Sequence, residues 1–569
     1  MTESRPYPRQ FVREADPLSD WSQIEPYFDL LRDRDISTVE ELERWLLDCS
    51  ELMACIDEVG TDREVKYTCQ TDDPERKRAH LDYVENIAPR CKPRWNELNL
   101  KYVRSPAAAG LPRPRYFVFD RSVHNTVELY REENVPLQVE EAKLQQQFQE
   151  ISGAMTVQFD GREQTLQQLA VYSERTDRAT RRAAWEAGTQ RRLQDCHALE
   201  DIFDRLFKLR HQMAANAGLR DFRDYMFKAK ERFDYTPQGC VAFHDAIESA
   251  VVPVMRAMLA RRKRLLKVDP LRPWDLSVDV KGRPPLKPFD TSAELCDRCA
   301  RIFHRVHPML VAQFDEMRRN GYLDLDSRKG KAPGGYQAPY YESRHPFIFM
   351  NAVGLQRDVR TLIHEGGHAF HSYACRDEPL IHYRSAPIEF AEVASMGMEM
   401  LAYDCLDEFY TGEELQRAKQ MQLEGIIAFF PWMAIIDAFQ HWMYSHPDHS
   451  RAARRDEWLR LHERFGGTEE YGGYEEALAY GWQRQLHLFS VPFYYVEYGI
   501  AQLGALQVWR NARQNRPKAI EAYRAALGLG GSRPLPDLFT AAGAKFDFSL
   551  DTLGPLMQMV QRELDELGD

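Results

Sequence analysis

The stretch VGLQRDVRTLIHEGGHAFHSYAC, residues 353–375, combines a helical pattern with a metal-binding one. Its apolar residues recur at helical spacing, which predicts a buried helix. His364 and His368 stand four positions apart, so they share one face of that helix and could bind one metal ion. Glu365 follows His364 and lies on the flank of this helix face, where its carboxylate could take a proton from a water beside the metal.

Two features of this stretch leave alternatives open. With 17 histidines in the chain, chance alone would produce an HExxH pattern in roughly four of a hundred such sequences. Gly366 and Gly367 each cost about 1 kcal/mol relative to alanine inside a helix. Their presence indicates either that another backbone approaches the helix closely or that the helix packs against a neighbouring helix.

A third ligand is expected farther along the chain, because catalytic zinc sites use three protein ligands and keep one position open. The version of the motif with a third histidine, HExxHxxGxxH, does not fit, since other residues occupy the places of its glycine and last histidine. The stretch SAPIEFAEVASMGMEM, residues 385–400, places Glu389, Glu392 and Glu399 along a second predicted helix. From spacing alone, Glu389 and Glu392 are both candidates for the third ligand.

Strand signals are few, and helical periodicity dominates the rest of the chain. MTVQFDGREQTLQQL, residues 155–169, is typical of a hairpin turned at Asp160-Gly161. HPFIFMN, residues 345–351, predicts a short strand that is either plain core or an edge for pairing with an extended peptide. We therefore expect a mainly α fold with a small sheet near residues 320–350. A boundary near residue 200 would separate an N-terminal helical lobe, 1–200, from a catalytic lobe, 201–569.

Composition excludes several classes of partner. The 569 residues are 44% hydrophobic and carry a net charge of −12, without the basic stripe that nucleic acid binding requires. The N-terminus lacks the apolar core of a signal peptide, and the longest apolar run contains Pro431 and Asp437, so no membrane span is expected. Ten scattered cysteines are typical of free thiols in a reducing compartment, and we expect a cytoplasmic location.

A second group of polar residues lies far downstream, in HLFSVPFYYVEYGIAQ, residues 487–502. His487, Tyr494, Tyr495 and Tyr498 are close together in this stretch. They form either an aromatic core stripe or a set of phenol and imidazole donors that stabilise the oxyanion of a tetrahedral intermediate.

Three of these segments resemble a known family. HEGGHAFHSY (364–373), EFAEVAS (389–395) and FYYVEYG (493–499) are similar, in that order, to the thimet oligopeptidase and oligoendopeptidase F family of zinc metallopeptidases. The oligoendopeptidase F branch is the nearer one, and the resemblance covers roughly residues 37–560. It implies a mainly helical, two-lobed zincin peptidase with a deep substrate channel and one Zn²⁺ per chain.

The resemblance also assigns roles to individual residues. His364, His368 and Glu392 match the zinc ligands, and Glu365 matches the general base, which leaves Glu389 as an expected partner that orients a ligand. Tyr495 and Tyr498 resemble substrate-contacting tyrosines, and His487 resembles the family's upstream histidine. Val496-Glu497 between the tyrosines and the small Gly366 depart from the usual pattern.

The function that these residues predict is a zinc-dependent endopeptidase acting on short oligopeptides, in which Glu365 is the base and Tyr498 and His487 hold the oxyanion. Two alternatives stand beside it: a dipeptidyl carboxypeptidase using the same zinc site, and a zinc-stabilised peptide-binding protein without catalysis. Short peptides are the expected partners, and the sequence does not indicate an oligomeric state.

Overall fold

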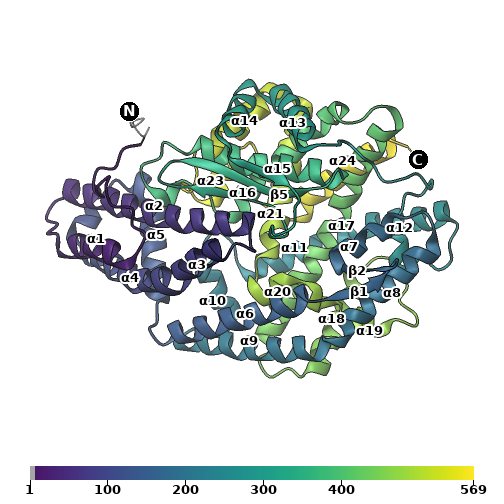
Figure 1. The fold of residues 1–569 in the computed structure, drawn as a ribbon, viewed down its shortest axis with the longest axis horizontal. Helices are drawn as coiled ribbons and strands as arrows, with labels where there is room; N and C mark the ends of the chain where they lie inside the picture. Colours follow the sequence, from purple (N-terminus) through teal and green to yellow (C-terminus); the bar gives the residue numbers. More distant parts are fainter. Residues whose placement is uncertain (1–6, 569) are drawn as a thin grey trace. The chain divides into compact units, whose positions relative to one another are not determined.

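The computed structural model describes residues 7–568, which pack as two compact units (Figure 1). Unit 1 comprises residues 7–128, 287–418 and 501–546, and unit 2 comprises residues 129–286, 419–500 and 547–568. The predicted mainly helical architecture is confirmed. The boundary expected near residue 200 falls inside unit 2, within a helix, so the ranges 1–200 and 201–569 do not coincide with the two units. A deep channel stays a prediction.

Unit 1 contains two groups of helices separated along the sequence. The first group is α1 (Trp21–Asp33), α2 (Val39–Cys69), α3 (Pro74–Asp82), α4 (Ala88–Arg104) and α5 (Arg113–Leu129), which ends at the first residue of unit 2. The second is α13 (Ser292–Val306), α14 (Pro308–Asn320), α15 (Gln356–Ala374), α16 (Ile388–Ala402), α22 (Arg516–Leu527) and α23 (Leu535–Ala541). A π-helical turn (Tyr83–Ile87) joins α3 to α4, and short 3₁₀ turns cover Pro106–Gly110, Ile381–Tyr383 and Tyr403–Glu408.

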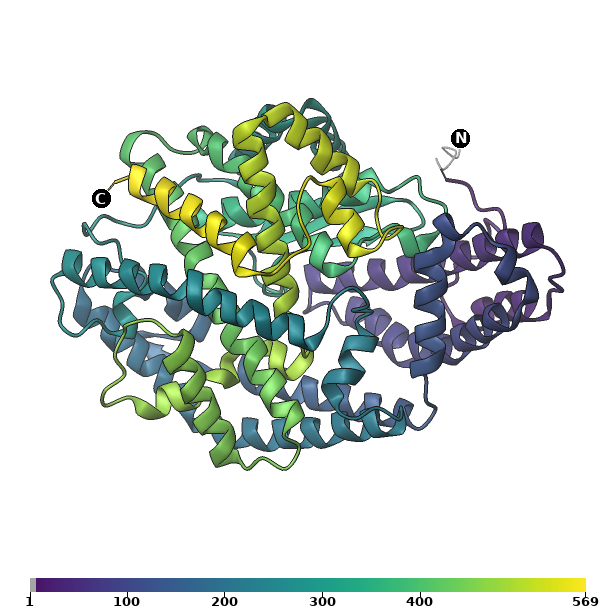
Figure 2. The same cartoon turned by 180° about the vertical axis from the view of Figure 1, so that it is seen from behind.

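Unit 2 is almost entirely helical. Its helices are α6 (Asn134–Gly153), α7 (Leu166–Leu169), α8 (Arg178–Gln194), α9 (Cys196–Asn216), α10 (Phe222–Ala229), α11 (Pro237–Ala250), α12 (Val252–Leu266), α18 (Arg451–Phe465), α19 (Glu475–Ala479), α20 (Leu486–Ser490) and α24 (Leu550–Glu566), with 3₁₀ turns at Ala170–Glu174, Pro273–Asp275 and Gly481–Arg484. The C-terminal helix α24 lies along α11, as the view from behind shows (Figure 2). The predicted hairpin is confirmed: β1 (Thr156–Phe159) pairs antiparallel with β2 (Arg162–Thr165), and Asp160 and Gly161 both have positive φ.

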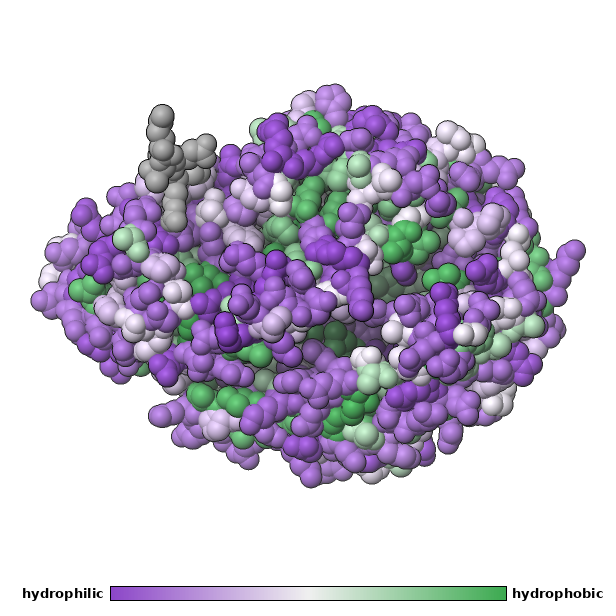
Figure 3. Space-filling model, in the orientation of Figure 1, coloured by the Kyte–Doolittle hydropathy of each residue, from purple (hydrophilic) through white to green (hydrophobic). Residues whose placement is uncertain are grey.

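Two long helices continue from one unit into the other in sequence, α17 (Gly412–Ser445) and α21 (Tyr495–Gln514). By length and composition alone, α17 could cross a membrane, since its most apolar window has a mean hydropathy of 1.3. However, 67% of that window is buried within the protein, as in a core helix. On the face shown in Figure 3, hydrophilic residues predominate and hydrophobic ones are scattered. None of the ten cysteines, all of which lie in the described residues, forms a disulfide.

The predicted sheet lies in unit 1 and has three strands, in the order β3 (Leu323–Asp326), β5 (His345–Ala352) and β4 (Tyr336–Tyr340). β5 pairs parallel with β3 and antiparallel with β4. The strand predicted at residues 345–351 is therefore central, hydrogen-bonded on both sides. Its interpretation as an edge for a peptide is wrong, and its interpretation as core is confirmed by the burial of Ile348, Phe349 and Met350.

Helix α15 packs against both this sheet and helix α16, and the two glycines explain how closely it packs. A Cβ atom on Gly367 would lie 2.5 Å from the carbonyl oxygen of Ala394 and 2.6 Å from Cα of Ser395. Only glycine lets the two backbones come this close. A Cβ atom on Gly366 would lie 2.8 Å from Cζ of Phe303 on α13, so there a side chain fills the space. Close approach of another backbone therefore explains Gly367, and packing against a neighbouring helix explains Gly366.

The substitution Gly367→Ala is expected to lower the free energy of unfolding by about 1–3 kcal/mol, because α15 and α16 must separate to admit the methyl group. Gly366→Ala is the matched control and should cost less, since the ring of Phe303 can move and alanine favours a helix. Urea denaturation of both variants measures the difference. Equal stability of Gly367→Ala and the wild type would show that this close approach is not required.

Candidate metal centre

The side chains of His364, His368 and Glu392 converge in unit 1, with one potential ligand atom from each within 4.8 Å of the others. Oε2 of Glu392 lies 3.4 Å from Nε2 of His364 and 3.5 Å from Nε2 of His368. The histidines come from α15 and the glutamate from α16, the two helices whose backbones come close together at Gly367. Two imidazole nitrogens and one carboxylate are the donors of catalytic zinc sites, so this set fits a divalent metal ion.

Hydrogen bonds fix how two of these ligands are oriented. Nδ1 of His364 donates to Oε1 of Glu399 at 2.7 Å, which turns Nε2 towards Glu392. Nε of Arg360 donates to Oε2 of Glu399 at 2.5 Å and so holds that carboxylate in place. Oγ of Ser395 donates to Oε2 of Glu392 at 2.8 Å.

The site combines partly exposed imidazoles with a buried carboxylate. The side chains of His364 and His368 keep 21% and 19% of their surface exposed, whereas Glu392 keeps 8%. Burial opposes ionisation of Glu392, but the two imidazoles outweigh it and hold its pKa well below the usual range. For His364, burial lowers the pKa, but the neighbouring carboxylates Glu392 and Glu399 have the larger effect. The pKa of His364 is therefore raised overall. Partly exposed nitrogens beside buried carboxylates favour binding of a cation with one position left open.

Glu365 lies on the same helix and is 7% exposed. Burial is the main cause that raises the pKa of its carboxyl group. A raised pKa brings a carboxylate closer to the range in which it can accept and return a proton near neutral pH. This environment suits the general base that the sequence predicts at this position.

Three residues around the ligands were not assigned from the sequence: Glu399, Arg360 and Ser395. The signal for Glu399 was present, because it follows Glu392 by seven residues and therefore lies two turns along the same helical face. The carboxylate that orients a ligand histidine is thus observed at Glu399. Glu389 is buried on the same helix, and its expected role as an orienting partner stays a prediction.

The predicted tyrosines and His487 lie together in unit 2, so the structure brings the downstream site residues into one cluster of their own. The ring of His487 lies 4.8 Å from that of Tyr495 and 6.1 Å from that of Tyr498. Tyr494 stacks edge-on against Tyr498 at 5.1 Å. Nε2 of Gln485 donates to Nδ1 of His487 at 2.6 Å, which places the proton of the neutral imidazole on Nε2. Burial and the charge of Lys230 lower the pKa of His487 to about 4.

The unusual residues between the two tyrosines have a structural explanation. Val496 is fully buried, and Glu497 is 2% exposed. Glu497 forms ion pairs with Arg232 at 2.8 Å and with Lys230 at 3.2 Å. The first turn of α21 is thereby anchored through Glu497, while Tyr495 and Tyr498 remain half-buried on other sides of the helix.

Comparison with known proteins agrees with this arrangement. Residues 171–553 match Peptidase family M3. The chain belongs to this family. It is similar to an oligoendopeptidase F homolog of Borreliella burgdorferi, with 27% identity over 59% of each chain. It is also similar to the oligopeptidase PepF of Bacillus subtilis, with 23% identity over 56% of this chain and 47% of the relative.

The matched regions thus span about half to three-fifths of these two relatives. Agreement of the folds is more extensive. The structure of PZ peptidase A, solved with an inhibitor, matches with a TM-score of 0.90 and 25% identity, covering 96% of this chain and 97% of that one. The resemblance to oligoendopeptidase F and the mainly helical peptidase fold are both confirmed.

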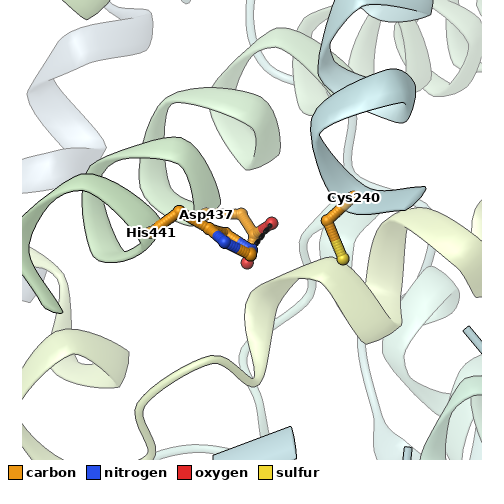
Figure 4. A group of neighbouring side chains, drawn as sticks. All are labelled: Cys240, Asp437 and His441. Atoms are coloured by element: carbon orange, nitrogen blue, oxygen red, sulfur yellow. Dashed lines mark ion pairs between the residues drawn. The ribbon is translucent and has the colours of Figure 1, made fainter. Parts of the chain in front are cut away.

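A second group of potential metal ligands occurs in unit 2 of this M3 peptidase. Cys240 on α11 and the pair Asp437 and His441 on α17 offer three ligand atoms within 4.8 Å of one another (Figure 4). All three residues are buried. Oδ2 of Asp437 lies 2.9 Å from Nε2 of His244 and 3.3 Å from Nε2 of His441.

We interpret this second group as a structural network. Burial would raise the pKa of Asp437, but His441 and His244 outweigh burial and hold the pKa well below the usual range. A buried carboxylate needs such partners because desolvation of the charged form is costly. Unlike the first group, this one has no exposed ligand through which water or substrate could enter.

The variant Glu399→Gln is expected to weaken zinc binding by about 10–100-fold, since the orienting hydrogen bond acceptor of His364 loses its charge. Glu389→Gln is the matched control, with the same chemical change on the same buried helix. Competition with a fluorescent zinc chelator measures both affinities. A larger loss in Glu389→Gln than in Glu399→Gln would restore the role that the sequence assigned to Glu389.

The variant Asp437→Asn is expected to lower the free energy of unfolding by about 1–3 kcal/mol, because it removes the charged hydrogen bond acceptor of His244. Its zinc content per folded chain should equal that of the wild type, whereas His368→Ala should lose zinc. Elemental analysis of the three dialysed proteins tests this. Two zinc ions in the wild type and one in Asp437→Asn would show that the buried group binds metal.

Proposed function

We propose that this M3 peptidase is a zinc-dependent endopeptidase that hydrolyses internal bonds of short oligopeptides, and that it works in the cytoplasm. The observation that carries the proposal is the convergence of His364, His368 and Glu392, with Glu365 one position from the first ligand. Family membership and the similarity to an oligoendopeptidase F homolog and to an oligopeptidase support it.

In the proposed mechanism, His364, His368 and Glu392 would hold a zinc ion, which would supply the Lewis acidity needed to polarise a peptide carbonyl and to lower the pKa of a water molecule. The carboxylate of Glu365 takes the proton of that water and then passes it to the nitrogen of the leaving amine. The raised pKa of Glu365 favours both halves of this transfer, because the carboxyl group can hold the proton between the two steps.

Tyr498 and His487 would stabilise the charge that develops on the carbonyl oxygen. The hydroxyl of Tyr498 and Nε2–H of His487 are hydrogen bond donors suited to an oxyanion. The hydrogen bond from Gln485 supports this for His487, since it fixes the tautomer that carries the proton on Nε2. Tyr495, three positions before Tyr498 on the same turn of α21, would contact the bound peptide.

The variant Glu365→Gln is expected to retain zinc but to lose activity by several orders of magnitude, because the amide cannot accept the proton of the attacking water. The assay is cleavage of an internally quenched peptide blocked at both ends, using protein as purified, after chelation and after zinc is restored. Activity of the wild type should disappear with the chelator and return with zinc.

The matched control is Glu414→Gln, the same substitution at an exposed position, which should leave the rate unchanged. Mass spectrometry of the products completes the test. Release of dipeptides only from unblocked C-termini would indicate a dipeptidyl carboxypeptidase instead. Binding of peptides without cleavage, with zinc present, would indicate a binding protein.

A further inference from the structure

Unit 2 contains a cavity that the proposed chemistry does not use. Its volume is about 340 Å³, within the range of small-ligand sites, which is about 300–1,000 Å³. It is bounded by α8, α18, the segment from α7 to Glu174, and the segment from Tyr471 to Arg484. All of its lining residues belong to unit 2, so the cavity is complete within that unit.

The walls of this cavity are aromatic. Trp185 lies 5.4 Å from Trp274 and 6.4 Å from Tyr471, ring to ring. On the other side, Trp432 packs against the buried Trp458 at 6.0 Å. Trp185, Tyr471 and Trp432 are only partly buried, so their ring surfaces are available to a ligand. Flat aromatic surfaces in a hollow favour a planar, apolar group such as an aromatic side chain.

Two arginines add positive charge to the same hollow. Arg192 and Arg484 line the cavity, and neither forms an ion pair with any of residues 7–568. Desolvation by the cavity wall and the charge of Arg484 lower the pKa of Arg192, although its side chain keeps an exposed surface. The guanidinium of Arg484 lies over the ring of Trp432 at 4.8 Å. Two close guanidinium groups favour a carboxylate between them.

The other charged groups near the cavity do not cancel these two arginines. Arg181 is buried and pairs with Asp275 at 2.9 Å. Glu469 interacts with Arg484, but it does not line the cavity. The cavity lining itself contains no carboxylate, so Arg192 and Arg484 make it positively charged.

Two residues of the lining have a buried polar atom without a partner. Among the described residues, neither Nε1 of Trp274 nor Nε2 of His462 has a hydrogen bond partner. Trp274 is 6% exposed, and burial with the charge of Arg484 lowers the pKa of the His462 imidazole to about 4. Both atoms are buried, so neither is exposed to the cavity.

The cavity is contiguous with the residues proposed to contact the substrate. Trp432 lines the cavity, and it lies near enough to Tyr495 to affect the pKa of that phenol, as does Gln485, the residue after Arg484. Gln485 in turn holds His487. A peptide lying along Tyr495 and His487 could therefore continue past Trp432 into the hollow.

We propose that this cavity binds an aromatic residue of a peptide together with a nearby carboxylate, which Arg192 and Arg484 hold while the ring lies among Trp185, Trp274 and Trp432. The identification of the ligand as a peptide rests on the proposed function. The carboxylate is either the free C-terminus of the peptide or an acidic side chain beside the aromatic one.

Titration calorimetry with the full-length Glu365→Gln protein tests this without cleavage. The probes are four acetylated pentapeptides of otherwise identical sequence: one ending in Phe with a free carboxylate, one ending in Ala, one ending in Phe amide, and an amide with an internal Phe-Glu pair. The peptide that lacks the aromatic ring and the peptide that lacks every carboxylate should each bind about tenfold more weakly than the Phe acid. This is the effect expected for one ring or one charge-assisted contact. The Phe amide and Phe-Glu arms distinguish the two sources of the carboxylate.

The double substitution Arg192→Ala and Arg484→Ala in this protein should abolish the preference for a carboxylate. Arg191→Ala is the matched control, because Arg191 neighbours Arg192 but pairs with Asp195 and lies outside the cavity lining. The preference must also persist after zinc is removed, which separates the cavity from the metal centre. Equal binding of acid and amide, or an unchanged preference in the double variant, would overturn the inference. Peptide cleavage is measured in its own assay. Failure of the binding test would therefore contradict the cavity proposal, whereas failure of the cleavage assay would contradict the proposed function.

Discussion

The close contact between α15 and α16 at Gly367 is the constraint on which the candidate metal centre depends. The ligand histidines lie on one helix and Glu392 on the other, and the Nε2 atoms are within 3.5 Å of the carboxylate. A side chain at position 367 would place a Cβ atom 2.5 Å from the carbonyl oxygen of Ala394 and so force the backbones apart. Because metal ligands must meet within narrow distance limits, the cost that glycine imposes on helix stability is offset by the geometry it allows.

The same packing explains how several charges can be buried in one place. Glu399 is held between Arg360 and His364, so each of its oxygens accepts a hydrogen bond from a different helix turn. Glu392 has two imidazoles and a serine hydroxyl as partners. Buried carboxylates persist only where partners compensate for desolvation. The hydrogen bond to Glu399 turns Nε2 of His364 towards Glu392, so this nitrogen is the one placed to bind a metal.

Local patterns were sufficient to predict much of this structure. The hairpin at Asp160-Gly161, the helix carrying HEGGH and the meeting of its histidines all follow from residues close in sequence. The central position of β5 could not be predicted, because a short apolar strand has the same sequence pattern in the middle of a sheet as at its edge. The two units combine distant segments, and no local signal marks the crossings inside α17 and α21. Glu399 was accessible from helical spacing, but the histidine it contacts belongs to another helix.

Exposure distinguishes the two buried acid–histidine groups, which are otherwise chemically similar. In unit 2, Asp437 has no exposed surface and its histidines at most 6%, so substrate has no access to them. In unit 1, about a fifth of each ligand histidine faces outward while the carboxylate behind them stays buried. A catalytic metal must bind protein on one side and a reactant on the other. Only the first group has this asymmetry, and it is the group that lies beside a glutamate able to accept a proton.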